Sequence, residues 1–347
     1  MSTRLMIYGA YGYTGDLMVQ EAVRRGLTPV IAGRSATKLG PLTEAFGLEA
    51  RVFSVEQAAE HLDGIDVVVN CAGPFAATAP AFVEACLSRK VHYLDITGEI
   101  AILQFCHNQD SRAQEAGVVL CPGAGFDIVP TDCLAATLKE KLPDADNIDI
   151  AFSFGTRPSI GTIKTAIEGT ANGGLVRENH RLVAVPQAHI IRRLPFPGKT
   201  RWAVTFPWGD VFTAGISTGV PNGMVFAAMP LPLGLGMRIS HYLRFIFARP
   251  AVIRFLKHMA ERFLAGGPSD EALAMQRTEF WGEARNAQGQ KVSGTLSGPN
   301  VYTLTVDTAL AIAVHCLDEA VTGGYRTPSM LMGSRFFASR PDVTVSY

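Results

Sequence analysis

The sequence predicts an α/β protein, in which an N-terminal Rossmann-type, doubly wound parallel sheet precedes a second α+β domain. Over the first 130 residues, apolar runs and helix-like stretches alternate about every 20 to 30 residues. A glycine-rich turn follows the first apolar run. From residue 131 onward the alternation gives way to longer β patterns. The 347 residues, of which 48% are apolar, are enough for two domains.

Six short apolar runs predict the strands of the parallel sheet. They lie at residues 5–8, 29–32, 51–53, 66–70, 92–96 and 118–121. Helical stretches separate them at residues 16–26, 79–90 and 101–117. This order of elements is typical of a sheet built from βαβ units.

The remainder of the chain has a different rhythm. A predicted helix at 131–142 leads to β patterns at 147–155 and 201–217, a hairpin at 278–294 and a helix at 301–320. We therefore expect residues 1–130 to form the Rossmann domain and 131–325 to form an α+β substrate or dimerisation domain. Residues 326–347 are expected to return to the first domain.

Charge and cysteine content narrow the possible functions. Lys and Arg together number 31, as do Asp and Glu, so we expect no nucleic-acid partner. The six cysteines show no CxxC and no zinc-ligand spacing, and we expect no metal site. The first residues run directly into a strand without a signal-peptide pattern, so a reduced, cytoplasmic setting is expected.

The stretch GAYGYTG predicts a dinucleotide-binding turn. Gly9, Gly12 and Gly15 follow a strand and precede a helix, so they can allow a tight turn, close approach to a pyrophosphate and close helix packing. The helix N-terminus would hold the negative charge, and the Thr14 hydroxyl could bind a phosphate oxygen. A purely structural bend is the alternative. The candidate cofactor-binding residues here are Gly9, Tyr11, Gly12, Tyr13, Thr14 and Gly15.

The residues after the second strand favour NADP(H) over NAD(H). An NAD enzyme usually has a carboxylate there to bind the ribose 2′-hydroxyl, but AGRSATKL contains none. Arg34, Ser35 and Lys38 lie where a 2′-phosphate would bind, and a guanidinium matches a phosphate well. Alternatively, Arg34 and Lys38 only form a solvated helix start.

Three further loops follow the fourth, fifth and sixth strands, where open α/β sheets bind ligands. They are NCAGPF (70–75), DITGE (95–99) and PGAGFDIVPTD (122–132), and their small residues allow close approach of a ligand. The candidate cofactor-binding residues in these loops are Cys71, Ala72, Gly73, Pro74, Thr97, Gly98, Gly125 and Phe126.

Ionisable residues in the same loops are the candidates for catalysis. Asp95, Glu99 and Asp127 are nearest to the expected nicotinamide, and we select Glu99 and Asp127 together with Lys164 from the second domain. Helix capping is the alternative, by Asp127 or Thr131 before the helix at 131–142 and by Glu99 before the helix at 101–117.

Taken together, these motifs resemble those of the saccharopine dehydrogenase-like oxidoreductases, a group that includes trans-acting enoyl reductases. GAYGYTG resembles the group's GATGYTG, AGRSATKL its AGR…KL, and PGAGFDIVPTD its PGxGFDxxPxD, while NCAGPF and YLDITGE match almost completely. The hairpin EFWGEARNAQGQKV and TPSMLMG (compare TPAxALG) extend the resemblance over most of the chain. Tyr11 departs from the pattern, because threonine is usual there.

The resemblance implies an NADP-binding domain, a second domain that closes over the nicotinamide, and hydride transfer. It does not imply saccharopine as substrate, because several carboxylates would call for a basic pocket. The Phe, Trp, Leu and Met residues of the second domain favour an apolar or acyl-type substrate with a C=C or C=N bond, unless they are simply core. The alternative is a non-catalytic NADP-binding redox sensor or a protein that acts at a membrane or lipid surface.

The region around residues 211–262 raises the question of a membrane. Residues 211–237 carry no charge, but several prolines and glycines argue against a spanning helix. The stretch that follows is basic and aromatic-rich, so residues 224–262 could make peripheral membrane contact, or could pack on the sheet as amphipathic helices. Apolar surface in this domain could also be covered in a homodimer.

Overall fold

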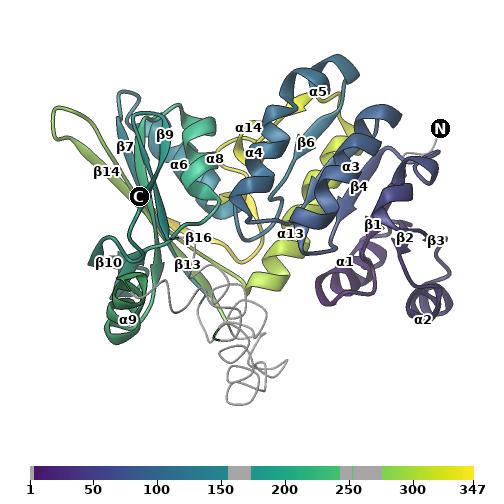
Figure 1. Ribbon diagram of the computed structural model, residues 1–347, viewed down its shortest axis with the longest axis horizontal. Helices are drawn as coiled ribbons and strands as arrows, with labels where there is room; N and C mark the ends of the chain where they lie inside the picture. Colours follow the sequence, from purple (N-terminus) through teal and green to yellow (C-terminus); the bar gives the residue numbers. More distant parts are fainter. Residues whose placement is uncertain (1–3, 155–172, 243–251, 253–275) are drawn as a thin grey trace. The chain divides into compact units, whose positions relative to one another are not determined.

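The computed structural model describes residues 4–154, 173–242, 252 and 276–347 (Figure 1). The chain divides into two compact units. The first unit consists of Met1–Cys133 and Tyr302–Phe337, and the second of Leu134–Val301 and Ala338–Tyr347.

The first unit is built on a seven-stranded, entirely parallel sheet in the order β15-β6-β5-β4-β1-β2-β3. Its strands are β1 (Leu5–Tyr8), β2 (Val30–Gly33), β3 (Ala50–Val52), β4 (Val67–Asn70), β5 (His92–Asp95), β6 (Val119–Cys121) and β15 (Gly324–Tyr325). The Rossmann-type prediction is confirmed, with all six predicted strands. The chain reverses its direction of winding between β1 and β4, which is where such sheets bind their ligands.

Helices connect these strands. They are α1 (Tyr13–Arg24), α2 (Ala36–Phe46), η1 (Val55–Glu60), α3 (Phe75–Arg89), α4 (Ile100–Asn108) and α5 (Asp110–Ala116). Helices α3, α4 and α5 pack on one another (Figure 1). On α1, Arg25 beyond its last turn forms a 2.7 Å ion pair with Asp307 of α13 (Val301–Asp318), and the rings of Tyr13 and Tyr302 lie 4.7 Å apart. Helix α13 therefore lies beside α1.

The observed domain boundary differs from the prediction that 131–325 form the second domain. Residues 302–325 lie in the first unit because α13 packs on the loop after β6. The Thr308 hydroxyl donates to the Ala124 carbonyl (2.9 Å), and the Phe126 N–H donates to the Thr305 hydroxyl (3.1 Å). The predicted C-terminal segment 326–347 is also divided, since only its part up to Phe337 lies in the first unit. The short helix α14 (Pro328–Met332) belongs to that part.

The second unit contains a nine-stranded mixed sheet with the path β10-β11-β12-β7-β13-β14-β16, from which β8 and β9 branch at β12. Its strands are β7 (Asn147–Ser153), β8 (Gly174–Glu178), β9 (Arg181–Val185), β10 (Ile191–Phe196), β11 (Lys199–Thr205), β12 (Asn222–Ala228), β13 (Thr278–Arg285), β14 (Lys291–Gly298) and β16 (Thr344–Ser346). Of the described strands in this sheet, only β12 and β7 pair in parallel. The prediction of a second α+β domain is confirmed.

Among the residues that the structure describes, the helices of the second unit are α6 (Val129–Lys141), which begins in the first unit, α8 (Asp210–Thr218) and α9 (Leu231–Tyr242). The predicted β pattern at 201–217 is wrong after Thr205, because α8 replaces its second half. The run of apolar residues in VFTAGIS suits a buried helix as well as a strand. Gly219, with φ of 70°, ends the helix.

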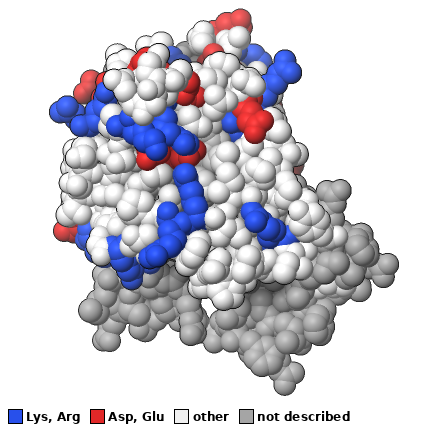
Figure 2. All heavy atoms as spheres, turned by 90° about the vertical axis from the view of Figure 1, so that its left-hand side faces the viewer, with Lys and Arg blue, Asp and Glu red and all other residues white. Residues whose placement is uncertain are grey.

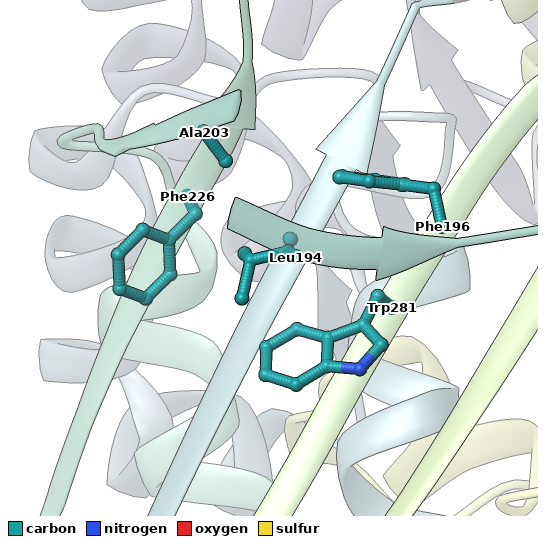
Figure 3. Packing of buried hydrophobic residues seen from close by; sticks show 6 residues of the cluster. Leu194, Phe196, Ala203, Phe226 and Trp281 are labelled. Atoms are coloured by element: carbon teal, nitrogen blue, oxygen red, sulfur yellow. The ribbon is translucent and has the colours of Figure 1, made fainter. Parts of the chain in front are cut away.

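The hairpin β10–β11 curls over the sheet of the second unit and encloses a small apolar cluster (Figure 3). Leu194 and Phe196 of β10 pack with Ala203, Phe226 and Trp281 from the neighbouring strands. These side chains are buried at the level of a domain core. Phe226 and Trp281 are therefore core residues of this domain, which is the alternative to a role in substrate binding.

Candidate functional site

The glycine-rich turn has the geometry that a bound pyrophosphate requires. Gly9 has φ of +79°, and a Cβ there would lie 2.9 Å from the Ala72 nitrogen. At Gly15 a Cβ would lie only 2.2 Å from the Gly9 carbonyl oxygen, so helix α1 must start directly against β1. Within the part of the chain that the structure describes, no side chain caps α1 at Gly12. The N-terminal N–H groups of this helix are thus available to an anion.

A second anion-binding position lies at the end of β2. Ser35 is the N-cap residue of α2, and its side chain makes no capping hydrogen bond. The side chains of Arg34 and Lys38 are exposed and form no ion pair with any carboxylate of the described residues. The helix N-terminus and the two cations together match a phosphate, as predicted for the 2′-phosphate of NADP(H).

The loops after β4, β5 and β6 are tied together by a buried polar network. The Asn70 amide donates to the Tyr93 hydroxyl (3.3 Å), which donates to Asp95 Oδ2 (2.8 Å). Asp95 Oδ1 accepts from the N–H groups of Thr97 (3.0 Å) and Gly123 (2.9 Å). Sequence reasoning considered Asp95 only as a group near the nicotinamide and missed Asn70 and Tyr93.

Asp95 is fully buried, and burial raises the pKa of its carboxyl group to about 6 despite the hydrogen bonds that lower it. The carboxylate binds three donors and so holds together the loops that follow β5 and β6. Asp95 therefore acts as a structural tie at the sheet edge, not as a group that faces a substrate.

Glu99 is predicted to be catalytic or to cap the helix that follows it, and in the structure its side chain instead caps a different helix. Its carboxylate accepts hydrogen bonds from the N–H groups of Phe75 (2.9 Å) and Ala76 (3.0 Å). It therefore caps helix α3, a neighbour in space, and not helix α4, which Glu99 precedes in the chain. These two hydrogen bonds give Glu99 a structural role at the start of α3.

Asp127, the second predicted catalytic carboxylate, lies against Gly98. A Cβ at Gly98 would come within 3.0 Å of Asp127 Oδ2, so only glycine leaves room for this side chain. The residue as a whole is partly exposed, but burial of its carboxyl group raises the pKa to about 7. A carboxyl group with this pKa can exchange a proton at neutral pH.

The structure places the other predicted site residues as follows. The loops with Gly9–Gly15, Arg34–Lys38, Cys71–Pro74 and Thr97–Gly98 all follow carboxyl ends of adjacent strands, and so share one edge of the sheet. Burial raises the pKa of the Cys71 thiol to about 12, which keeps it neutral.

Two predicted cofactor contacts have structural partners. Gly125 and Phe126 pack against Thr305 of α13, which sequence reasoning did not connect to this loop.

Lys164, the third predicted catalytic residue, lies outside the described residues. Among the residues that the structure describes, no group of three His, Cys, Asp or Glu side chains is placed to hold a metal ion.

The geometry fits a dinucleotide with a phosphorylated ribose, and comparison with known proteins gives the family. A model of the saccharopine dehydrogenase NADP-binding domain matches residues 5–121. The predicted resemblance and the predicted cofactor, NADP(H), are both confirmed by this match.

Several curated relatives support the same assignment. The probable mitochondrial saccharopine dehydrogenase-like oxidoreductase of Arabidopsis thaliana is 24% identical over 95% of this chain and 92% of its own length. The trans-acting enoyl reductase of Mycobacterium ulcerans is 28% identical over 52% of this chain and 48% of its own. The lipid droplet localized protein of Caenorhabditis elegans is 29% identical over 48% of this chain and 44% of its own. The match to the last two thus spans about half of each relative.

The fold of the whole chain is also found in a solved structure. Apo saccharopine dehydrogenase (L-Glu forming) from Saccharomyces cerevisiae superposes with a TM-score of 0.65 over 100% of both chains, at 10% sequence identity. At this identity the similarity shows the fold alone. The chain is thus similar to saccharopine dehydrogenase-like oxidoreductase enzymes, in sequence over its NADP-binding part and in fold over both domains.

One described helix, α13, is long and apolar enough to cross a membrane when only length and composition are considered. Its hydroxyls bond to the loop after β6, and Leu304, Leu310 and Ile312 are fully buried in the structure. Packing in the first unit therefore accounts for its apolar composition.

Proposed function

We propose that the protein is an NADPH-dependent reductase that acts on a C=C or C=N bond of a small or acyl-type substrate. The observation that carries the proposal is the pair of exposed cations at the N-terminus of α2, Arg34 and Lys38, which form no ion pair with any carboxylate of the described residues. Two charges without a carboxylate partner at this position suit the ribose phosphate that distinguishes NADP(H) from NAD(H).

Each part of the sheet edge then has a task. The turn from Gly9 to Gly15 and the N-terminus of α1 bind the pyrophosphate, while Arg34, Ser35 and Lys38 bind the 2′-phosphate. When bound, NADPH supplies the hydride. Asp127 holds a proton at neutral pH and donates it to the substrate atom that does not receive the hydride.

The charges of the second unit favour a substrate without several carboxylates. Arg192 (2.8 Å) and Arg285 (2.7 Å) both pair with Asp149, and Arg201 pairs with Glu279. In Figure 2, Lys and Arg lie next to Asp and Glu in the upper part of the face turned toward the viewer, and a band of Lys and Arg runs below them. These three arginines are already engaged by carboxylates of the chain, and a relative named as an enoyl reductase supports an acyl-type substrate.

The experiment that tests the cofactor proposal is a titration with NADPH and NADH followed by calorimetry. Arg34→Gln should weaken NADPH binding by roughly 10- to 100-fold, because a hydrogen bond to a charged group contributes about 1.5–3 kcal/mol. NADH binding should change little. Arg112→Gln, which removes an exposed arginine paired with Glu84, is the matched control. Equal affinity of the unmodified protein for both nucleotides would sink the proposal.

The non-catalytic redox sensor remains the alternative, and turnover separates the two functions. A reductase should oxidise NADPH when an enoyl thioester or a cyclic imine is added. A sensor should bind NADPH with the same preference and show no substrate-dependent oxidation.

We further propose that α9 makes peripheral contact with a lipid surface. Leu233, Leu235, Ile239 and Tyr242 of this helix are 45–69% exposed. Arg238 is the only Lys or Arg in the helix, and its guanidinium donates to the Ala188 and His189 carbonyls. An outward face of this kind is typical of helices that bind lipid, and one relative is named for lipid droplets.

Vesicle sedimentation tests this contact. The double variant Leu235→Ser/Ile239→Ser should lose most of its binding to phosphatidylcholine vesicles that contain phosphatidylserine. The control is the exposed apolar pair Val345→Ser/Met330→Ser elsewhere on the chain. If the α9 variant instead converts a dimer to a monomer in light scattering, the helix covers a homodimer interface and the lipid proposal is wrong.

A further inference from the structure

Tyr11 lies against Gly33, Arg34 and Lys38, in the region that we propose for the 2′-phosphate. Its ring lies on Gly33 at the end of β2, where a Cβ would come within 2.5 Å of the ring. Its hydroxyl accepts a hydrogen bond from the Arg34 N–H (3.3 Å). The Lys38 ammonium lies 5.4 Å from the ring centroid, within the range of a cation–π interaction.

The hydrogen-bond capacity of the phenol is only partly used. A tyrosine hydroxyl can accept and also donate one hydrogen bond. With the Arg34 N–H as donor to Tyr11, the hydroxyl proton has no acceptor among the described residues. This proton lies beside Arg34, just before the N-terminus of α2, so an anion placed there would receive donors from the phenol and from the helix.

The ring has a separate effect on charge. Lys38 is exposed, with no carboxylate partner in the described part of the chain, and a free lysine side chain samples many rotamers. The Tyr11 face holds its ammonium near Arg34. In the saccharopine dehydrogenase-like oxidoreductases, threonine is usual at this position. Threonine has a hydroxyl but no ring, so it could not hold the Lys38 ammonium by a cation–π interaction.

We propose that Tyr11 is a specificity-determining residue of this chain for a phosphorylated adenosine ribose. Its hydroxyl donates to a phosphate oxygen, and its ring positions the Lys38 ammonium against the same group. A ribose with a free 2′-hydroxyl gains little from either contact, because it carries no charge. This inference rests on the proposed NADPH binding.

The test uses the full chain and two small probes, adenosine 2′,5′-bisphosphate and adenosine 5′-monophosphate, with binding measured by calorimetry. Tyr11→Phe removes the hydroxyl and keeps the ring, and should weaken bisphosphate binding about tenfold while monophosphate binding changes less than about twofold. Tyr11→Thr removes the ring as well and should weaken bisphosphate binding further. Tyr302→Phe, which removes a hydroxyl from α13, is the control.

The outcomes separate this inference from the proposed function. If the unmodified protein prefers NADPH over NADH and Tyr11→Phe keeps that preference, Tyr11 does not set specificity although the cofactor proposal stands. An equal loss for both probes means that Tyr11 only shapes the glycine turn, which also overturns the inference. If the unmodified protein binds neither NADPH nor the bisphosphate, both proposals fall. Thermal unfolding midpoints of the variants check that they are folded.

Discussion

Three carboxylates at one sheet edge differ in chemistry because their partners differ. Asp95 meets three donors, Glu99 meets two N–H groups at a helix N-terminus, and Asp127 is held against Gly98 with a raised pKa. A carboxylate fixed by strong donors is a structural group. Burial raises the pKa of both Asp95 and Asp127, to about 6 and about 7, but three donors fix Asp95 in place, so Asp127 is the one suited to proton transfer.

The pH dependence of the reaction provides a test of Asp127. If Asp127 is the proton donor, the rate of substrate reduction should be highest below about pH 7 and should fall as pH rises through this value, because the protonated fraction decreases. Asp127→Asn should lower kcat by roughly 10²- to 10⁴-fold and abolish this dependence. NADPH affinity measured by calorimetry serves as the control and should not change. A variant that keeps the wild-type pH profile would assign the donor elsewhere.

Stability gives an independent measurement on the same group. Burial raises the pKa of Asp127 in the folded protein above the ordinary value of 3.8, so the folded protein binds more protons than the unfolded chain between about pH 4 and pH 7. The contribution of Asp127 to stability is therefore present below about pH 4 and is lost as pH rises to about 7. Asp127→Asn should remove this decline, and urea unfolding of both proteins across this pH range checks it.

Glu99 should behave as a structural residue. Glu99→Gln keeps the shape but weakens the interaction with the N-terminus of α3, so we expect a loss of about 1 kcal/mol in the free energy of unfolding. The turnover number should stay within about threefold of wild type. A large loss of kcat without a change in the urea midpoint would return Glu99 to a catalytic role.

Motif position predicted these residues, but not their partners. The spacing of DITGE and PGAGFD was enough to place Glu99 and Asp127 after adjacent strands. The sequence could not show that Glu99 reaches α3, because its acceptor role depends on a contact 23 to 24 residues away. Gly98 in turn makes room for Asp127, a feature that only the folded chain reveals.

At the scale of elements, the strands of the first unit could be predicted because βαβ units repeat a local pattern. The same reasoning failed for α8, where an apolar run is compatible with either helix or strand. It also missed β15, since a strand of two residues has no periodicity and exists only through its pairing with β6. The placement of α13 depends likewise on distant contacts of Thr305 and Thr308.

The hydroxyl of Thr308 allows this placement of α13 to be tested. Thr308→Val keeps the side-chain shape but leaves the buried Ala124 carbonyl without this donor, so we expect a loss of about 1–3 kcal/mol in the free energy of unfolding. Thr37→Val, at an exposed position of α2, is the matched control and should change stability by less than about 0.5 kcal/mol. Equal urea midpoints for both variants would show that the hydroxyl contributes nothing to the packing of α13.

At the scale of the whole molecule, the first unit is assembled from two separate parts of the chain. The later part contributes α13, which contacts the loop after β6, and β15, which extends the sheet. It also contributes the Ser329 N–H, which donates to the buried carboxylate of Asp132 (2.7 Å). The family domain that spans residues 5–121 is therefore covered by residues that follow the second unit in the sequence.

A fragment of residues 1–133 should therefore be incompletely folded. Without α13, the apolar side chains that pack beneath it are exposed to water, and the buried Asp132 loses a hydrogen-bond donor. We expect the fragment to bind a hydrophobic dye and to unfold without a sharp transition. A chain in which a flexible linker joins Cys133 to Tyr302 and ends at Phe337 should unfold cooperatively and bind NADPH. Circular dichroism measures the unfolding transition of the fragment and of the linked chain, and calorimetry measures their binding of NADPH. Because the glycine turn and the Arg34 region lie in the shorter fragment, tight NADPH binding by that fragment alone would show that the returning segment is not needed for the cofactor site.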